Sequence, residues 1–401
     1  MLVRSVIYRK NGWGFNFIRP FQMPLWSNLK RLYFSVDRSV KMNCHIVPQC
    51  YLKSWKVPTT KSSIYIFDKS KTLATNNNKN IENLSDTNFA FEDKYLIDVF
   101  NKDYMYKFYN HFSGIMSELN VTASSDGTVI LTETEFNNCL DNIDKWIYTA
   151  HDGTTIDVSI VLNLWNTKVA KTIEKYFGNN IETKWPMVKD YTTSHIMKRS
   201  WKVFAKHREI LFEFVVVQLL RRFENMQALG LSELIKELND VFATTIFDTA
   251  YEESHWLMQL YRYAIQKSNN SISRSVQSLS DNYQPCFLIA TGNAEFITSD
   301  NPCYIIKNLD YSYESGIYMP INPKVCLFLC NLDSHTDKNK YYIFDINDHN
   351  VKYINKQTRA HALKELAFHS DDISDLFCNN IDKSNWESIS NTLYNELYSK
   401  S

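Results

Sequence analysis

Glycine is scarce in this sequence, with 9 among 401 residues, and the motifs that depend on it are missing. Neither Gly-x-Gly-x-x-Gly nor Gly-x-x-x-x-Gly-Lys-Ser/Thr occurs, which argues against a Rossmann or P-loop nucleotide site. His-Glu-x-x-His, Gly-x-Ser-x-Gly and catalytic-cysteine signatures are absent as well. No stretch reaches the roughly 18 apolar residues that a membrane-spanning helix requires. The longest candidate, Phe214 to Leu220, stops at Arg221 and Arg222, so we expect a soluble protein without a membrane partner.

The eight cysteines form no Cys-x-x-Cys pair and no Cys/His cluster with zinc-finger spacing. Cys326 and Cys330 are four residues apart in a strand-like run, which puts them on one face. We interpret the cysteines as buried free thiols of a reducing compartment and expect a cytoplasmic location.

Net charge is zero overall but is unevenly distributed. Residues 1–41 contain eight basic residues and one acid, so the rest of the chain is net negative. Nucleic acid remains one candidate partner, although the main body lacks a bulk basic surface. We treat residues 1–42 as a basic N-terminal extension that is either disordered or a targeting segment, including an organelle transit peptide. Met42 begins the first well-patterned stretch.

The pattern along residues 43–401 predicts a single α+β domain. A short strand is expected near 64–68, and the region 95–270 is expected to be mostly helical. Its clearest signals are a capping box, Thr132-x-x-Glu135, and an apolar helical stripe over 156–177.

From 284 to 354 the chain consists of short apolar runs separated by turn residues. We predict an antiparallel sheet there, joined by the strand near 64–68, packed on the helical middle, and a hairpin at 291–295. Two helices, near 356–367 and 385–398, are expected to close the chain.

The most informative motif is Ser299-Asp300-Asn301-Pro302, which follows a strand-like run. Asp and Asn are ordinary turn residues whose side chains bond the local backbone, so one interpretation is a structural turn. The other is functional: a carboxylate and an amide at a strand end can coordinate a hard metal, orient water or bind a polar substrate.

Two further groups of polar residues stand beside rigid or apolar elements. His45 and Gln49 flank Pro48, and the histidine either pins a turn or acts as a general base or metal ligand. Gln218 and Arg222 lie four apart on one face of an apolar helix. A buried arginine needs a partner, which is either an acid such as Asp300 or an anionic substrate group.

At these residues the sequence resembles the domain of unknown function 4238 (DUF4238) family over roughly residues 43–370. The family has a Gln-x-x-Arg element, which begins here at Gln218. The sequence departs from the family at Phe223-Glu224, where the family has Thr-Pro, so the arginine of this element is either Arg221 or Arg222. The resemblance implies a common fold and raises the expectation that His45 and Asp300 share one site, but it supplies no activity. The blocks that carry it are His45 to Leu52, Ile64 to Asp68, Gln218 to Arg221, Phe296 to Pro302, Ile317 to Pro323, and Asn355.

Two hypotheses follow. In the first, the protein is a hydrolase, phosphodiesterase or nuclease-like, with a catalytic His45, Asp300 and Asn301 and with Gln49, Gln218 and Arg222 as substrate-binding residues. A divalent metal would then be held by Asp300 or His45. In the second, the protein is a non-catalytic binding or regulatory module, and the same residues form a buried polar network that attaches the N-terminal segment to the sheet.

Overall fold

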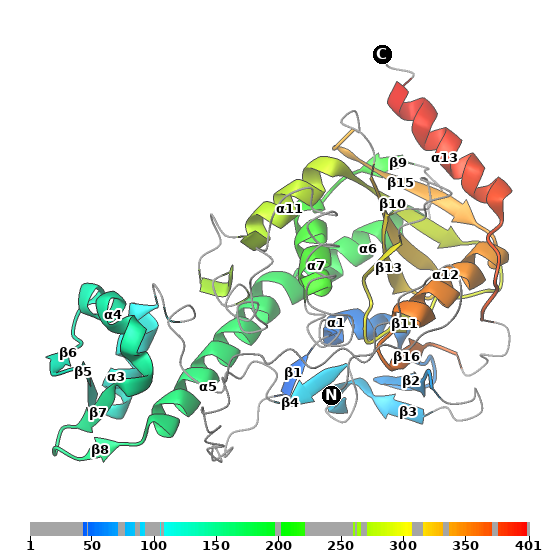
Figure 1. Cartoon of the computed structure of the whole chain (residues 1–401). Coiled ribbons are helices and arrows are strands. Elements are labelled where there is room, and N and C mark those ends of the chain that lie inside the picture. The colour runs from blue at the N-terminus through cyan, green and yellow to red at the C-terminus, as the bar shows by residue number, and fades with distance from the viewer. Residues whose placement is uncertain are drawn as a thin grey trace, which may run out of the picture. The chain divides into compact units, whose positions relative to one another are not determined.

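The protein is described by a computed structural model. Its fold is α+β, as predicted, with antiparallel and mixed sheets (Figure 1). The predicted extension, residues 1–42, lies outside the described residues. Those are 43–45, 47–70, 77–84, 89–92, 105, 108–196, 202–220, 260, 263–265, 271–306, 316–331, 337–370 and 376–398.

The largest sheet has the strand order β12-β13-β14-β10-β15-β9. Neighbouring strands run antiparallel except β10 and β15, which run parallel, so the sheet is mixed. The expected hairpin at 291–295 is wrong, because the segment after β10 leaves this sheet instead of turning back onto it. The strands are β9 (Lys202–Phe204), β10 (Tyr283–Ala290), β12 (Tyr304–Ile306), β13 (Gly316–Asn322), β14 (Val325–Asn331) and β15 (Lys340–Ile346).

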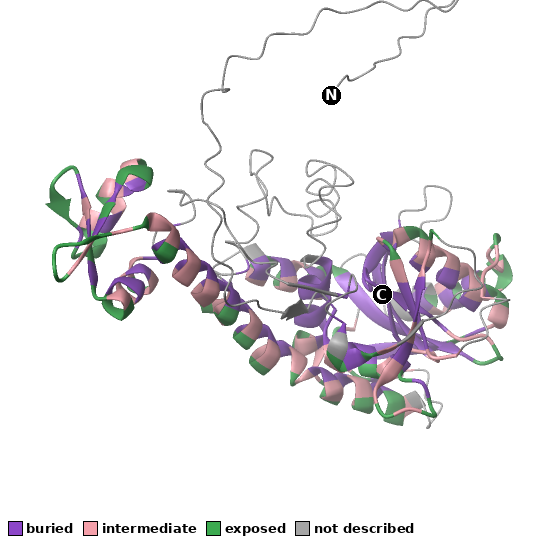
Figure 2. Cartoon of the chain, turned by 90° about the horizontal axis from the view of Figure 1, so that it is seen from below, coloured by how far each residue is buried: buried purple, intermediate pink, exposed green. Residues whose placement is uncertain are grey.

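Most residues of this sheet are buried on both of its faces, and most of them are apolar (Figure 2). Along β14, Leu327 and Leu329 belong to a cluster shared with α6 (Trp185–Ile196) and α7 (Arg208–Leu220). Cys326, Phe328 and Cys330 point the other way and join a cluster with α12 (Asp348–His361) and α13 (Lys383–Tyr398). The shared face predicted for Cys326 and Cys330 is therefore confirmed.

A second, four-stranded antiparallel sheet has the order β11-β16-β2-β3. The strand predicted near 64–68 exists, but it pairs with β16 rather than with the large sheet, in the register Phe67↔Leu366. The helix expected at 356–367 is partly wrong: α12 starts at Asp348, and β16 replaces its expected last turn. The strands are β2 (Ser63–Asp68), β3 (Asn77–Asn80), β11 (Thr298–Ser299) and β16 (Glu365–Phe368).

The helical middle contains a small sheet that the sequence pattern did not reveal. Its order is β6-β5-β7-β8, and it lies between α3 and α5 in the chain. The capping box at Thr132 and Glu135 is present and starts α4. The bounds are α3 (Tyr109–Leu119), β5 (Val121–Ser125), β6 (Thr128–Val129), α4 (Glu133–Cys139), β7 (Ile147–Ala150), β8 (Thr155–Ile156) and α5 (Val158–Phe177).

The remaining described elements are β1 (Asn43–His45), α1 (Gln49–Leu52), β4 (Ala90–Glu92) and α11 (Ser271–Asn282), with short 3-10 turns at Lys53–Trp55, Ile81–Asn83 and Leu140–Lys145 and a π-turn at Gly178–Glu182.

Candidate functional site

Asp300 is fixed by the backbone that leads into β16. Its Oδ1 accepts a hydrogen bond from the Leu363 N–H at 2.8 Å, and its Oδ2 accepts from the N–H groups of Lys364 and Glu365 at 2.8 and 2.9 Å. In return the Asp300 N–H donates to the Glu365 carbonyl at 3.0 Å. The residue is 1% exposed. Its carboxylate therefore holds the start of β16 against the end of β11.

The electrostatic environment of Asp300 has two opposing parts. Burial raises the pKa of this carboxyl above its ordinary value, because the charged form loses solvation. The three N–H donors and the positive charge of Lys69 act in the opposite direction. A perturbed acid in an open cleft would suggest catalysis, but structural networks perturb acids as well.

Asn301 is buried beside Asp300 and spans to the end of α12. Its Nδ2 donates to the His361 carbonyl at 2.7 Å, and its N–H donates to the Ser299 Oγ at 3.1 Å. The Ser299 hydroxyl donates back to the Asn301 carbonyl at 2.8 Å, which is an ordinary turn arrangement. The Asn301 Oδ1 has no partner among the described residues.

The same network reaches the N-terminal part of the fold through Tyr51 in α1. Its hydroxyl lies 2.9 Å from the Thr298 Oγ1 and also donates to the Pro320 carbonyl. Asn355 in α12 accepts from the Ile297 N–H at 3.0 Å and donates to the Glu295 carbonyl at 2.8 Å. The motif at 296–302 is thus connected to α1, to β13 and to α12.

The structure describes the backbone of His45 but not its side chain. His45 ends β1 and pairs with Ala90 of β4. The juxtaposition of its imidazole with Asp300 therefore stays a prediction. Gln49, which begins α1 directly after Pro48, is half-buried.

Gln218 lies near the end of α7 and is 2% exposed. Neither its Nε2 nor its Oε1 has a hydrogen-bond partner among the described residues. Arg221 and Arg222 lie outside the described residues, so the predicted pairing of an arginine with Asp300 is untested. Among the residues that the structure describes, Lys69 contributes a positive charge that acts on Asp300.

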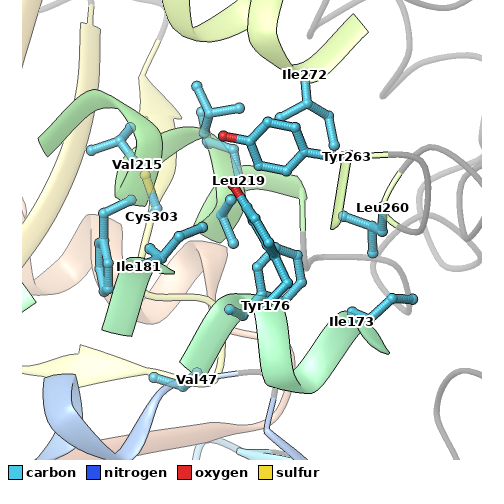
Figure 3. Close-up of a cluster of buried hydrophobic side chains, with 14 of the residues drawn as sticks. Val47, Ile173, Tyr176, Ile181, Val215, Leu219, Leu260, Tyr263, Ile272 and Cys303 are labelled. Atoms are coloured by element: carbon cyan, nitrogen blue, oxygen red, sulfur yellow. The ribbon is translucent and has the colours of Figure 1, made fainter. Parts of the chain in front are cut away.

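The flank of α7 that carries Val215 and Leu219 faces Tyr176 and Tyr263 in the apolar cluster of Figure 3. A second buried acid, Glu213, lies on the same helix, and its Oε1 accepts from the Tyr176 and Tyr263 hydroxyls at 3.1 and 2.6 Å. Burial raises the pKa of both tyrosines, and the charge of Glu213 adds to the effect.

The hydrolase hypothesis included a divalent metal, and we searched the described residues for its ligands. Among the residues that the structure describes, no group of three or more His, Cys, Asp or Glu side chains is placed to hold a metal ion. The Asp300 carboxylate already accepts three backbone N–H bonds and the residue is 1% exposed, so little of it is accessible to an ion.

The structure also contains a polar cavity of about 510 Å³, which the sequence pattern did not predict. Its wall includes Glu295, Asp348, Lys352 and His369. Each of these residues stands alone in the sequence, and Glu295 and His369 are 74 positions apart. Only the placement of Glu295 just before β11, and of His369 just after the neighbouring strand β16, brings them together.

No helix in the described part of the chain is both long and apolar enough to cross a membrane. No curated protein and no solved structure matches the chain. The family model described as "Protein of unknown function (DUF4238)" matches residues 43–372 and confirms the resemblance drawn from the motifs. Because this match spans most of the sequence, the chain belongs to the DUF4238 family.

Proposed function

We propose that the protein is a non-catalytic binding module and that the Asp300-Asn301-Pro302 turn is a structural staple within it. The observation that carries this proposal is the state of Asp300, whose two oxygens accept three backbone N–H bonds at 1% exposure. A general base has to reach the proton that it removes, and a metal ligand has to offer a lone pair toward the ion. Asp300, at 1% exposure, presents its carboxylate to the backbone of β16 and not to solvent.

The competing hypothesis is a phosphodiesterase or nuclease that uses His45, Asp300 and Asn301. It requires Asp300 and Asn301 to face substrate, whereas they are 1% and 0% exposed. The hydrogen bonds of Asn301 and Tyr51 favour a network that ties separate elements together. Such a network specifies one packing arrangement and needs no substrate.

The test compares Asp300→Ala with the wild type in two assays. Removing the carboxylate leaves three backbone N–H groups without their acceptor, and an unsatisfied buried donor costs about 1–3 kcal/mol. We expect a clear fall in melting temperature and no metal-dependent hydrolysis of nucleic acid by either protein. Asp345→Asn, at an exposed position in β15, is the matched control and should leave the melting temperature unchanged.

The proposal fails if the wild type hydrolyses nucleic acid with added divalent metals and Asp300→Ala folds normally but loses that activity. His45→Ala extends the test to the N-terminal block. If His45 belongs to the structural network, this substitution should also lower the melting temperature. Two fully stable variants would contradict the staple.

We also propose that residues 43–401 form one domain and that the protein resides in the cytoplasm. The first point is supported by a hydrophobic cluster that includes both Val47 and Ala367. The second is supported by the absence of disulfide bonds among the seven cysteines that the structure describes, four of which are buried: Cys50, Cys139, Cys286, Cys303, Cys326, Cys330 and Cys378.

A further inference from the structure

The sheet β6-β5-β7-β8 has one covered face and one exposed face. Val121, Ala123 and Tyr148 are each at most 7% exposed and pack in the main hydrophobic cluster with Phe112 of α3 and Phe136 of α4. Successive residues of a strand point to opposite faces of the sheet. The residues that alternate with these three strand residues therefore point the other way, to a face that we call the outer face.

The outer face carries three exposed apolar side chains. The register places Val129 of β6 opposite Ser124 of β5, and Ser124 opposite Ile147 of β7, so these three residues share a face. Leu131 follows the buried Ile130 and returns to the same side. Val129, Leu131 and Ile147 are 43%, 65% and 54% exposed, which shows that no described element covers them.

The remainder of the outer face is small and uncharged. Thr122 pairs with Thr149 across β5 and β7, and Thr149 pairs with Thr155 of β8. Single exposed apolar residues are ordinary on a protein surface. Here, however, three of the seven large apolar residues that are exposed in the described part of the chain lie on one face of one small sheet. Such a patch marks a candidate interaction surface.

The region that builds this sheet, residues 109–157, is strongly acidic. It contains eight acidic residues, one lysine and no arginine, so its net charge is −7. Seven of the eight acids are exposed, among them Asp126 in the turn between β5 and β6 and Asp152 in the turn between β7 and β8. Because β5 and β7 are antiparallel, these two turns lie at opposite ends of the sheet. The apolar patch therefore has acidic residues at both ends.

The charge decides between the candidate occupants of this face. Glu135 and Asp157 also cap helices, but the remaining six acids still outnumber the one lysine. Two copies of the face would bring two acidic regions together, and a nucleic acid or an anionic membrane would meet the same repulsion. A cationic protein segment is attracted by the acids, and its apolar side chains would be buried against Val129, Leu131 and Ile147.

We propose that the outer face docks a cationic segment of a partner protein that carries apolar side chains. This inference rests on the proposed binding function, to which it adds a surface and a class of partner. The outer face spans only four short strands, so the interface is smaller than the roughly 1,200 Å² that a stable complex buries. We therefore expect weak, salt-sensitive binding, in which the apolar contacts supply affinity and the acids supply long-range attraction.

The test uses three synthetic dodecapeptides as probes and the full chain as their binder. The first peptide alternates lysine with valine, the second lysine with serine, and the third glutamate with valine. In fluorescence anisotropy we expect the lysine–valine peptide to bind, the lysine–serine peptide to bind about tenfold more weakly, and the glutamate–valine peptide not to bind. Binding of the lysine–valine peptide should weaken as ionic strength rises from about 0.05 to 0.5 M, because the Debye length shortens.

A first double variant tests the apolar patch. Leu131→Ser/Ile147→Ser should weaken binding of the lysine–valine peptide about tenfold or more, since each change removes an apolar contact. The matched control is Met187→Ser/Phe204→Ser, at positions that are 44% and 60% exposed on α6 and β9, and it should bind as the wild type does.

A second double variant tests the acids and leaves the apolar patch intact. Asp126→Asn/Asp152→Asn should weaken binding about threefold and reduce its dependence on salt. The matched control is Asp190→Asn/Asp345→Asn, which removes two exposed acids outside residues 109–157 and should change neither quantity.

The inference is overturned if the lysine–valine peptide does not bind, if either other peptide binds as tightly, or if binding survives Leu131→Ser/Ile147→Ser. Sedimentation shows whether a second copy occupies the face: a wild-type dimer that Leu131→Ser/Ile147→Ser dissociates would also overturn it. None of these results bears on the staple, which is judged by the stability of Asp300→Ala. A stable Asp300→Ala variant that still binds the lysine–valine peptide would refute the staple and leave the docking surface standing.

Discussion

Replacing Gln218 by methionine gives the sharpest test of how the core of this protein is built. Gln218 is 2% exposed, and both polar atoms of its amide lack a partner among the described residues. An unsatisfied buried polar group costs about 1–3 kcal/mol, and methionine has nearly the same shape as glutamine. We therefore expect Gln218→Met to stabilise the folded state by about 1–3 kcal/mol.

The contrasting substitution is Gln284→Met in β10. Gln284 is 0% exposed, but its Nε2 donates to the Lys340 carbonyl at 2.6 Å, while its Oε1 is unpartnered. Methionine would remove that hydrogen bond, and the Lys340 carbonyl would lose this donor. We expect Gln284→Met to destabilise by about 1–2 kcal/mol, which is opposite in sign to Gln218→Met.

Urea unfolding followed by tryptophan fluorescence, with calorimetry as a second probe, measures both effects. For a chain of this size 1 kcal/mol shifts the melting temperature by only about 1–2 °C, so the urea midpoint is the better readout. Suppose Gln218→Met destabilises the protein as much as Gln284→Met does. The Gln218 amide then has a hydrogen-bond partner in the protein in solution, and the argument that this amide is unsatisfied is refuted. If it stabilises but a ligand-dependent property is lost, then Gln218 has a binding role that costs stability.

Three further predictions concern single contacts. Tyr263→Phe removes the 2.6 Å bond to the buried Glu213 and should destabilise by about 1.5–3 kcal/mol in urea unfolding; no loss would mean that water replaces the hydroxyl. Hydrogen bonds from Ser384 and Asn347 lower the pKa of Asp382, so its stabilising effect is present above its unfolded pKa of about 3.9 and is lost as pH falls through the lower folded value. The stability difference between wild type and Asp382→Asn should therefore shrink below about pH 4, and a constant difference from pH 7 to 2 would contradict this. Gly292→Ala should lower the melting temperature because its Cβ meets Asp348, and Asp348→Ala in the same chain should recover part of that loss.

The site was predictable only in part, for physical reasons. The turn Asp300-Asn301-Pro302 is visible in the sequence because local backbone chemistry requires those residue types. Whether its carboxylate faces solvent or backbone depends on residues 363–365, and no local pattern contains that information. Glu295 and His369 give no sequence signal at all, since an isolated acid and an isolated histidine have no periodicity or motif.

The sequence by itself determined the class of the fold, the strand near 64–68, the capping box at Thr132 and the family, since each depends on short-range propensities or on a contiguous motif. The tertiary structure alone decided which sheet each strand joins. β2 pairs with β16 across nearly three hundred residues, and the parallel pairing of β10 with β15 converts an expected antiparallel sheet into a mixed one. Strand pairing is chosen by the burial of whole faces rather than by neighbours in the chain, and that choice also buried Asp300 and opened the cavity beside His369.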